Sequence, residues 1–391
     1  RLRTCLAGAI SESESFRLPE NLRGVTKGYP LMRSYFNYES MLRWRAEWLE
    51  KQLTGKLLVR STDRDFEASR QALLKRYVTF EFTPEVASIN WSVFLNDVKQ
   101  HSGRHRHQGG LVLFVIEGSG STDIDGTIYK WKRGDLITLP IRPGGVEHQH
   151  FNDHAGKDCR WVAFYYKPFE DWVCHTMTHI QDHTDAPAAT SITAAVASSQ
   201  TGLDLKLPEF QYREESSRRQ NLYDALIQIR DAQRQLRGPA SCIRRGDELP
   251  WEVNAHGIMR WYLHPLFLYT ALRNFNAYLQ CLPASSRSGL QKHPGDKVFF
   301  FLRGKGHTMI DGVRHDWGAE DLLILPIRPE GVAYQHFNDD PSAPAFLFAC
   351  EPNLAFIFDL DRGSSFEELE DAPEFKDESS GSDIAAKPPL F

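Results

Sequence analysis

The chain has 391 residues, of which 41% are apolar and 25% are charged, and it carries a formal net charge of −5. This is the composition of an ordinary globular protein with room for two domains, and it lacks the basic excess expected of a nucleic-acid-binding protein. No apolar run approaches the roughly 20 residues of a membrane-spanning helix, and no secretion signal is evident at the start. The six cysteines are scattered, which favours free thiols in a reducing compartment. These features predict a cytoplasmic protein with neither a nucleic acid nor a membrane as partner.

The first 78 residues are predicted to form an N-terminal helical arm. Within residues 1–78, apolar side chains recur at intervals of three and four over 40–53 and again over 64–78, which is the period of an amphipathic helix. Residues 79–183 then show short apolar and β-branched runs, separated by Gly-Ser-Gly, Asp-Gly and Arg-Gly-Asp turns. Evenly spaced short strands of this kind indicate an antiparallel barrel or sandwich.

A region of different character, 184–250, follows this β domain. Its first part, 184–202, consists of small and polar residues and is expected to be a flexible linker. Residues 218–236 place apolar side chains along one stripe and predict a helix. A second β domain is expected over 251–362, and the acidic segment 363–391 is expected to be a tail that lies on the surface or is disordered.

The two β domains contain copies of one another. When the sequence is shifted by 186 residues, 102–153 aligns with 288–339 without a gap, and 27 of the 52 aligned residues are identical. The longest shared block is LPIRPGGVEHQHFND in the first copy and LPIRPEGVAYQHFND in the second. Agreement over so many positions indicates an internal duplication.

Two histidines, His105 and His107, stand one residue apart just before the apolar run of the first copy. Because side chains alternate along a strand, both imidazoles would point to the same face. His148 follows 41 residues after His107, on what must be another strand. Three imidazoles leave a metal ion with its full positive charge and open positions, which suits an anionic chelating substrate and O2 on Fe(II). We interpret the three as metal ligands; the alternative is that they are surface histidines or hydrogen-bonded core histidines.

The second copy serves as an internal control for this interpretation. The three positions that hold His105, His107 and His148 in the first copy hold glutamine, histidine and tyrosine in the second. One imidazole, an amide and a phenol make a poor set of ligands for iron. The second copy is therefore predicted to be metal-free and structural. Its residues at these positions are Gln291, His293 and Tyr334.

The first copy resembles the two-part signature of the cupins. The likeness is carried by GRHRH (103–107), by the EGSG and RGD turns that follow, and by HQHFN (148–152). Two such units in one chain resemble the bicupins, and HRHQGGLVLFVIEG (105–118) is most similar to the gentisate and salicylate 1,2-dioxygenase group. The stretch MRWYLHP (259–265) before the second copy is also similar to that group, and the likeness extends over about residues 80–350.

The resemblance implies a mainly β fold with helical additions, built from two tandem jelly-roll cupin domains. The first (79–183) would bind the metal and the second (251–362) would be degenerate. The implied activity is that of a non-haem, Fe(II)-dependent, extradiol-type dioxygenase that cleaves the ring of a hydroxylated aromatic compound or aromatic acid with O2. Mn, Ni, Zn and Cu are the other metals considered, and a homodimer or homotetramer is the expected assembly. Two further functions stay open: a metal-dependent cupin isomerase, lyase or hydrolase that does not use O2, and a non-catalytic ligand-binding bicupin.

The sequence departs from two patterns of these families. Many metal-dependent cupins add a glutamate ligand that is separated from the second histidine by three or four residues, where Leu111 and Val112 stand here; this argues against a site of the oxalate-decarboxylase type. The gentisate-type enzymes carry a carboxylate-binding arginine six residues after that histidine, where Leu113 stands. This departure predicts a substrate other than gentisate. Three arginines remain as replacements for the missing charge: Arg104, Arg106 and Arg142.

Further site residues are predicted from differences between the copies and from the resemblance. Arg104, Gln108 and Tyr129 differ between the copies, which favours contacts with substrate over a role in the barrel. His150 and Arg142 occur in both copies, which favours a structural role, but the resemblance implies a substrate contact for His150. We predict His150 and Gln108 as catalytic residues. The predicted substrate-binding residues are Arg104, Arg142 and Tyr129.

A second histidine cluster occurs at the end of the first β domain, in the stretch CHTMTHIQDH. On a helix, its three histidines would line one face and could hold zinc. The stretch lacks the glutamate of a zinc-protease helix and precedes the linker, so a solvated face is favoured. The cluster consists of Cys174, His175, His179 and His183.

Overall fold

The computed structural model of the chain describes residues 38–79, 83–154, 156–183, 221–237, 240–354, 366–375 and 388. The chain divides into two units, Arg1–Trp48 and Leu49–Phe391, and every described strand lies in the second. Helix α1 (Tyr38–Thr54) confirms the helix predicted over 40–53. None of the described helices is both long and apolar enough to cross a membrane.

The first copy of the repeat forms an antiparallel barrel of two sheets, the first barrel. Its larger sheet has the strand order β13-β9-β6-β11-β4-β3-β2, and its smaller sheet has the order β12-β5-β10-β7-β8. The strands of the larger sheet are β2 (Glu67–Ala68), β3 (Leu73–Val78), β4 (Trp91–Asp97), β6 (Val112–Glu117), β9 (Leu136–Thr138), β11 (Arg160–Tyr166) and β13 (Ile243–Arg244). Those of the smaller sheet are β5 (Arg104–His107), β7 (Ser119–Ile124), β8 (Thr127–Lys132), β10 (Val146–Asn152) and β12 (Thr178–Gln181).

The second copy forms the second barrel in the same way. Its sheets have the orders β1-β21-β18-β23-β16-β15-β14 and β20-β19-β22-β17-β24. The larger sheet contains β1 (Leu58–Val59), β14 (Glu252–Asn254), β15 (Gly257–Leu263), β16 (Phe275–Leu282), β18 (Lys297–Arg303), β21 (Leu322–Leu325) and β23 (Ala345–Pro352). The smaller contains β17 (Leu290–His293), β19 (Gly306–Ile310), β20 (Val313–Trp317), β22 (Val332–Asn338) and β24 (Glu367–Glu370). Helices α2 (Lys167–Trp172) and α4 (Leu222–Arg237) and the 3-10 turns η3 (Ser61–Asp63) and η4 (Gly246–Glu248) complete the described elements.

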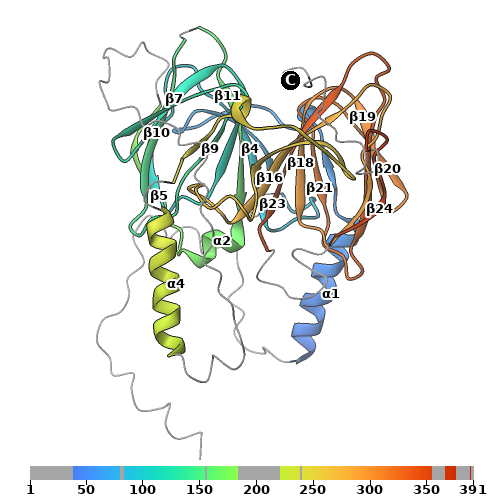
Figure 1. Cartoon of the computed structure of the whole chain (residues 1–391), viewed down its shortest axis with the longest axis horizontal. Helices are drawn as coiled ribbons and strands as arrows, with labels where there is room; N and C mark the ends of the chain where they lie inside the picture. Colours follow the sequence, from blue (N-terminus) through green and yellow to red (C-terminus); the bar gives the residue numbers. More distant parts are fainter. Residues whose placement is uncertain are drawn as a thin grey trace, which may run out of the picture. The chain divides into compact units, whose positions relative to one another are not determined.

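The larger sheets of the two barrels share one hydrophobic core, which explains why their central strands are apolar on both faces. In β6, Val112 and Phe114 belong to the shared core, whereas Leu113 and Val115 belong to the interior of the first barrel. The ring of Phe114 stacks on that of Phe348 in β23, with centroids 4.2 Å apart. Figure 1 shows the two larger sheets lying next to each other between the two smaller ones.

The barrels also exchange short strands. Strand β1 precedes the first barrel in sequence but pairs with β21 of the second, where Leu58 lies opposite Leu323. Strand β13 follows the linker region but pairs with β9 of the first barrel, where Ile243 lies opposite Ile137. Each barrel is thus completed by a short strand that lies outside its own copy of the repeat.

Two sequence predictions about local structure need correction. The helix predicted over 64–78 is wrong: this segment contains β2 and β3, because it pairs along the edge of β4 and the sheet overrides a short helical pattern. Part of the predicted acidic tail, Glu367–Glu370, is a strand that pairs with β17 of the second barrel. Helix α4 confirms the helix predicted over 218–236. The predicted linker 184–202 lies outside the described residues.

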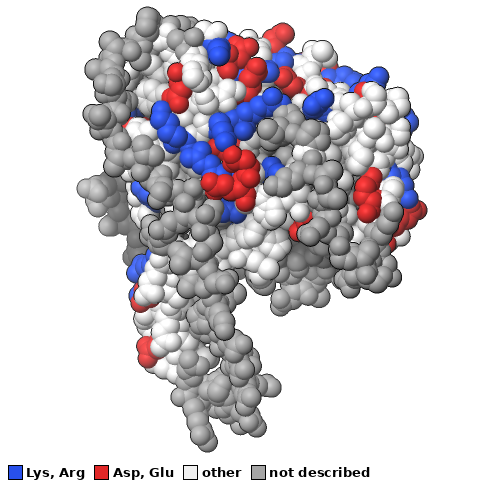
Figure 2. All heavy atoms as spheres, turned by 45° about the horizontal axis from the view of Figure 1, so that its top comes forward, with Lys and Arg blue, Asp and Glu red and all other residues white. Residues whose placement is uncertain are grey.

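Charged side chains of both signs are intermixed on the described surface. Figure 2 shows lysines and arginines interspersed with acidic residues on one face. Arg160 illustrates the pattern, because it forms ion pairs with Glu117 and with Glu320 of the second barrel. On the described part of this face there is no broad basic area of the kind that nucleic acids require.

Candidate metal centre

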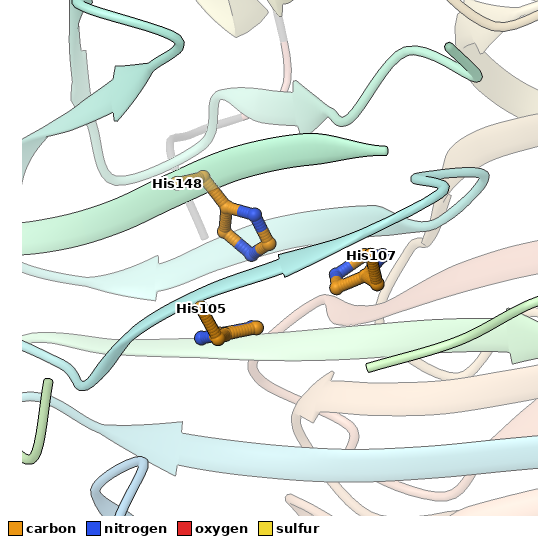
Figure 3. A group of neighbouring side chains, drawn as sticks. All are labelled: His105, His107 and His148. Carbon is orange, nitrogen blue, oxygen red and sulfur yellow. The ribbon is translucent and has the colours of Figure 1, made fainter. Parts of the chain in front are cut away.

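Three buried histidines converge between two adjacent strands of the first barrel. His105 and His107 project from β5, and His148 projects from β10 directly opposite His105 (Figure 3). Their side chains can place three ligand nitrogens within 4.8 Å of one another, and all three residues are at most 2% exposed. Strand alternation therefore acts as predicted and brings the two imidazoles of β5 to one face.

Burial keeps these three imidazoles neutral. It lowers the pKa of His105 to about 4 and holds the pKa values of His107 and His148 well below the ordinary value, and the neighbouring imidazoles lower them further. A histidine must be neutral to bind a metal ion. The three nitrogens, drawn together and unprotonated, fit a metal with open coordination positions.

Backbone groups orient the three rings. The Nδ1 atoms of His105 and His148 lie 3.2 Å and 3.3 Å from the carbonyl oxygens of Gly103 and Val146, which favours a hydrogen on Nδ1 and leaves Nε2 for a metal. His107 differs, because the N–H of Gly109 donates to its Nδ1 over 2.9 Å. Its Nε2 lies 3.2 Å from the hydroxyl of Tyr165. Metal binding through Nε2 of His107 would require this ring to change its tautomer.

The three histidines lie in the wall of a cavity of about 670 Å³. Apart from the three histidines, its walls are formed by six apolar side chains and a larger number of polar and ionisable ones. The apolar residues are Leu74, Phe94, Leu111, Leu113, Trp161 and Met177. The polar and ionisable residues are Gln71, Arg76, Ser92, His150, Tyr165, Lys167, Glu170, Asp171, Cys174 and His175.

His150, predicted as a catalytic residue, lines this cavity. Its ring centroid is 5.5 Å from that of His148, and burial lowers its pKa to about 3. Its Nδ1 lies 2.8 Å from the hydroxyl of Thr122, which fixes the ring. The structure thus places His150 beside the three candidate ligands, although the same bond to threonine occurs in the second barrel.

The predicted substrate contact of Arg104 is wrong. Arg104 and Arg106 alternate with the two histidines of β5, so they point to the opposite face of the strand. On that face both guanidinium groups pair with Glu147, and Arg104 also pairs with Asp123. Neither arginine lines the cavity.

Two other predicted substrate-binding residues also lie away from the cavity. Arg142 is half-exposed and pairs with Asp125 in a surface turn. Tyr129 packs against the barrel's own hydrophobic core beside Cys242. Neither of them lines the cavity, so their assignment to substrate binding needs the same correction.

Gln108 is placed to position a loop rather than to touch substrate. Its side-chain oxygen accepts a hydrogen bond of 2.6 Å from the N–H of Thr176, and its amide donates to the hydroxyl of Thr176 over 3.1 Å. Gln108 does not line the cavity, but the residues on both sides of Thr176, His175 and Met177, do. Gln108 directly follows His107 in the chain, and it thereby holds the segment around Thr176 in the wall of the cavity.

The second histidine cluster does not form a helical face. Its stretch turns sharply after α2 and continues as β12, so the three histidines separate. His175 lines the cavity, whereas His179 lies 2.8 Å from Asp182 in an ion pair. The helical zinc reading is therefore wrong, and His175 joins the candidate site.

Basic and acidic residues of the cavity that the sequence did not reveal come from segments outside the repeat alignment. Arg76 on β3 and Lys167 on α2 line the cavity and pair with Glu67 and Asp171 respectively. The segment of Arg76 reads as a helix in the sequence, so the face on which it lies was hidden. Tyr165 could have been found, because the 186-residue shift that relates the copies continues through β11 and β23.

Comparison with known proteins agrees with this architecture. Residues 95–165 match the family model described as cupin domain. A deletion variant of Bacillus subtilis oxalate decarboxylase superposes with a TM-score of 0.53 and 14% identity, covering 90% of each chain. The chain is a bicupin in fold. At this identity the likeness concerns the fold alone.

Two aromatic-acid dioxygenases are also similar to this bicupin. A 5-aminosalicylate 1,2-dioxygenase of Comamonas sp. is 26% identical over 96 residues, and the match spans a quarter of each chain. Salicylate 1,2-dioxygenase of Pseudoaminobacter salicylatoxidans, in a structure of its adducts with gentisate, has a TM-score of 0.49 and 16% identity over 82% of this chain and 92% of that one.

The second barrel of the bicupin replaces the three-histidine arrangement with a hydrogen-bonded network. The hydroxyl of Tyr334, which stands where the first barrel has its third histidine, donates to the side-chain oxygen of Gln291 over 2.8 Å. The amide of Gln291 in turn donates to Glu368 of β24. His293 Nε2 lies 2.9 Å from Glu351, which also pairs with Lys297 at 3.1 Å. Among the described residues, no group of potential metal ligands forms at this position.

Proposed function

We propose that this bicupin is a non-haem Fe(II)-dependent dioxygenase that cleaves the ring of a hydroxylated aromatic acid. The observation that carries the proposal is the ligand set: three buried neutral imidazoles without a carboxylate, in the wall of a cavity of about 670 Å³ whose other walls combine apolar and aromatic side chains with polar ones. Such a set retains the positive charge of the metal and favours an anionic chelating substrate. The likeness to two aromatic-acid 1,2-dioxygenases supports the choice of reaction.

The residues of the cavity divide the work between them. His105, His107 and His148 would hold the metal; bound there, Fe(II) supplies positions for the oxygens of the substrate and for O2 and relays electrons between them. The ring of His150, fixed by Thr122, would orient the substrate beside them. The apolar walls accept the aromatic ring and exclude water.

The charge missing at Leu113 is supplied from other elements in this proposal. Arg76 and Lys167 are basic residues that line the cavity, and they replace the three arginines considered from the sequence. Their positive charge would hold the substrate's carboxylate. The finer assignment of extradiol-type cleavage applies if the substrate carries two adjacent hydroxyls. The basic residues favour instead a substrate with a hydroxyl beside a carboxylate. In such a substrate the ring bond between the two substituted carbons is cleaved.

A metal-dependent reaction without O2 is the competing proposal. The oxalate decarboxylases share the fold, but here Leu111 and Val112 stand where a glutamate ligand is common in cupins, and both are buried. A cavity with Phe94 and Trp161 in its walls is also far larger than oxalate needs. These features favour the aromatic substrate.

The proposal is tested with the full chain prepared without oxygen and loaded with Fe(II). We expect one iron per chain and consumption of O2 with at least one member of a panel of salicylates, dihydroxybenzoates and catechols, with a ring-opened product identified by mass spectrometry. Stoichiometric iron without O2 uptake on the whole panel would contradict the dioxygenase and leave the competing proposal. Light scattering on the same sample tests the further proposal of a homodimer or homotetramer.

A further inference from the structure

A polar pair next to the candidate ligands has no role in the chemistry proposed above. The pair consists of Glu170 in α2 and His175 in the segment that follows; both line the cavity. The ring centroid of His175 is 5.1 Å from that of His107. The two side chains are only 14% and 17% exposed, so the pair is a largely buried part of the cavity wall.

The backbone holds His175 in place through an unfavourable turn. Cys174 adopts a φ of 51°, a left-handed conformation that is costly for a residue with a Cβ. The turn is closed by a hydrogen bond of 3.0 Å from the N–H of His175 to the carbonyl of Glu170. Gln108 clamps the next residue from the other side. Backbone strain of this kind is retained where the placement of a side chain matters for function.

In spite of this placement, one ring nitrogen of His175, Nε2, makes no hydrogen bond to the described residues. This nitrogen is also shielded from water. The distance from Nε2 to Glu170 Oε1 is 3.9 Å, which is too long for a hydrogen bond. His175 is also absent from the group of ligand atoms that lie within 4.8 Å of one another. Buried side-chain nitrogens are usually satisfied by the protein, so the open Nε2 of His175 calls for an explanation.

We propose that Glu170 and His175 form a specificity pair that recognises a hydrogen-bond-donating substituent, a hydroxyl or an amino group, on the ring of the bound aromatic acid. The inference rests on the proposed function and assigns these two residues a task in it. A carboxylate has about four positions for hydrogen bonds, so Glu170 can accept the proton of the substituent. A small rotation of the His175 ring toward the cavity would bring the shielded Nε2 within reach of the heteroatom of the substituent, which then supplies its missing partner.

Charge gives the pair a direction. The carboxylate of Glu170 repels the substrate's own carboxylate, whereas Arg76 and Lys167 in other parts of the wall attract it. A ring with an acid at one position and a donor at another therefore has one favoured orientation. A methoxy group in place of the donor offers no proton to the carboxylate of Glu170, so the hydrogen bond that favours the hydroxyl compound is not formed.

The test measures binding by calorimetry, with the Fe(II)-loaded full chain and without oxygen, so that no turnover is needed. The ligands are the four dihydroxybenzoates that carry one hydroxyl beside the carboxylate and the second hydroxyl at one of the four remaining ring positions. In a matched set of four compounds, a methoxy group replaces the second hydroxyl. For at least one position we expect the hydroxyl compound to bind about 10-fold more tightly than its methoxy counterpart. In Glu170→Gln and His175→Phe this preference should fall below about threefold.

Glu248→Gln, the same chemical change on the exposed turn η4, is the matched control and should keep the preference. If His175→Phe does not fold, His175→Gln removes the ring and keeps a polar side chain. Binding of aromatic acids without any preference for the donor, or a preference that survives in Glu170→Gln, would overturn the specificity pair and leave the proposed function standing. Failure of every aromatic acid to bind would overturn both.

Discussion

The two barrels keep the same buried polar scaffold. In the first, the hydroxyl of Thr122 accepts a hydrogen bond from Trp131 and contacts Nδ1 of His150, each over 2.8 Å; in the second, Thr308 makes the same two contacts at 3.0 Å and 2.7 Å. At the cavity they differ: Leu111 and Tyr165 in one barrel correspond to a lysine and a glutamate in the other. The duplicated residues that hold the barrel are preserved, and most of those that face its cavity have diverged, with His107 and His150 as exceptions.

This difference shows that the same barrel fold can enclose two different sets of polar side chains. The first draws three neutral imidazoles together and needs a cation to bind them. The second places Lys297 and Glu351 in the same region and satisfies them internally. A buried ion pair of this sort is costly to assemble and very costly to break on one side. Each interior therefore predicts its own response to mutation.

Exchanging the third ligand between the barrels should have the largest effect. His148→Tyr installs the phenol found in the second barrel and leaves two imidazoles, which we expect to lower metal affinity by more than about 100-fold and to abolish activity. Elemental analysis after dialysis measures the loss. Tyr334→Phe is the matched change in the second barrel and should keep one metal per chain; retention of full metal by His148→Tyr would refute the assigned ligand set.

Breaking the ion pair of the second barrel should destabilise the protein without removing the metal. In Lys297→Met, Glu351 remains buried beside His293 with no ammonium partner, at a cost of about 3–5 kcal/mol of unfolding free energy. Urea unfolding measures it. The double variant Lys297→Leu/Glu351→Tyr, which carries the residues of the first barrel, should recover most of the stability, and metal content should stay the same in both.

A buried carboxyl found only in the second copy should make stability depend on pH. Burial raises the pKa of Asp296 from 3.8 to about 6, so its contribution to stability is complete below pH 3.8 and is lost as the pH rises through 6. Asp296→Asn keeps an acceptor for the Tyr166 hydroxyl and tolerates the left-handed backbone. Unfolding free energies from pH 4 to 7.5 should fall by up to about 3 kcal/mol more in the natural chain than in the variant. Parallel curves would contradict the assignment.

The clamp by Gln108 should give the smallest effect. The second copy has Pro294 at the aligned position, which has no side-chain amide to offer. Gln108→Ala removes one neutral hydrogen bond to the N–H of Thr176, worth about 1 kcal/mol, so the exchange of that amide proton should become about fivefold faster. Hydrogen exchange followed by NMR measures this rate, and amides of β22 in the second barrel serve as the reference. An unchanged rate would show that the segment is held by other contacts.

The convergence of the three histidines could be predicted because it depends on two simple regularities. Strand alternation puts His105 and His107 on one face. The duplication draws attention to the three histidines, because the second copy holds other residues at two of the three aligned positions. The same alternation excludes Arg104, which lies between Gly103 and His105 and faces Glu147. Tyr129 was predicted to contact substrate because it differs between the copies. A residue that only packs against the core of the barrel can also change between copies, so this difference was misleading.

The rest of the cavity could not be predicted, because it is assembled from segments that the repeat does not cover. Arg76 comes from a strand whose sequence has a helical period, and only its pairing with β4 decides its structure. Glu170 and His175 lie between β11 and β12, where nothing in the sequence indicates a return to the site. Such contacts depend on tertiary structure and have no local signature.

The exchanged strands make the two barrels inseparable in a practical sense. A chain cut between residues 183 and 221 would leave β1 on the fragment that carries the first barrel and β13 on the fragment that carries the second. Each piece would thus hold a strand that its counterpart lacks, and would expose the half of the shared core around Phe114 and Phe348. The fragments should be insoluble alone and should reassemble when produced together. This dependence gives the second barrel a reason to persist: it cannot be discarded without losing the first.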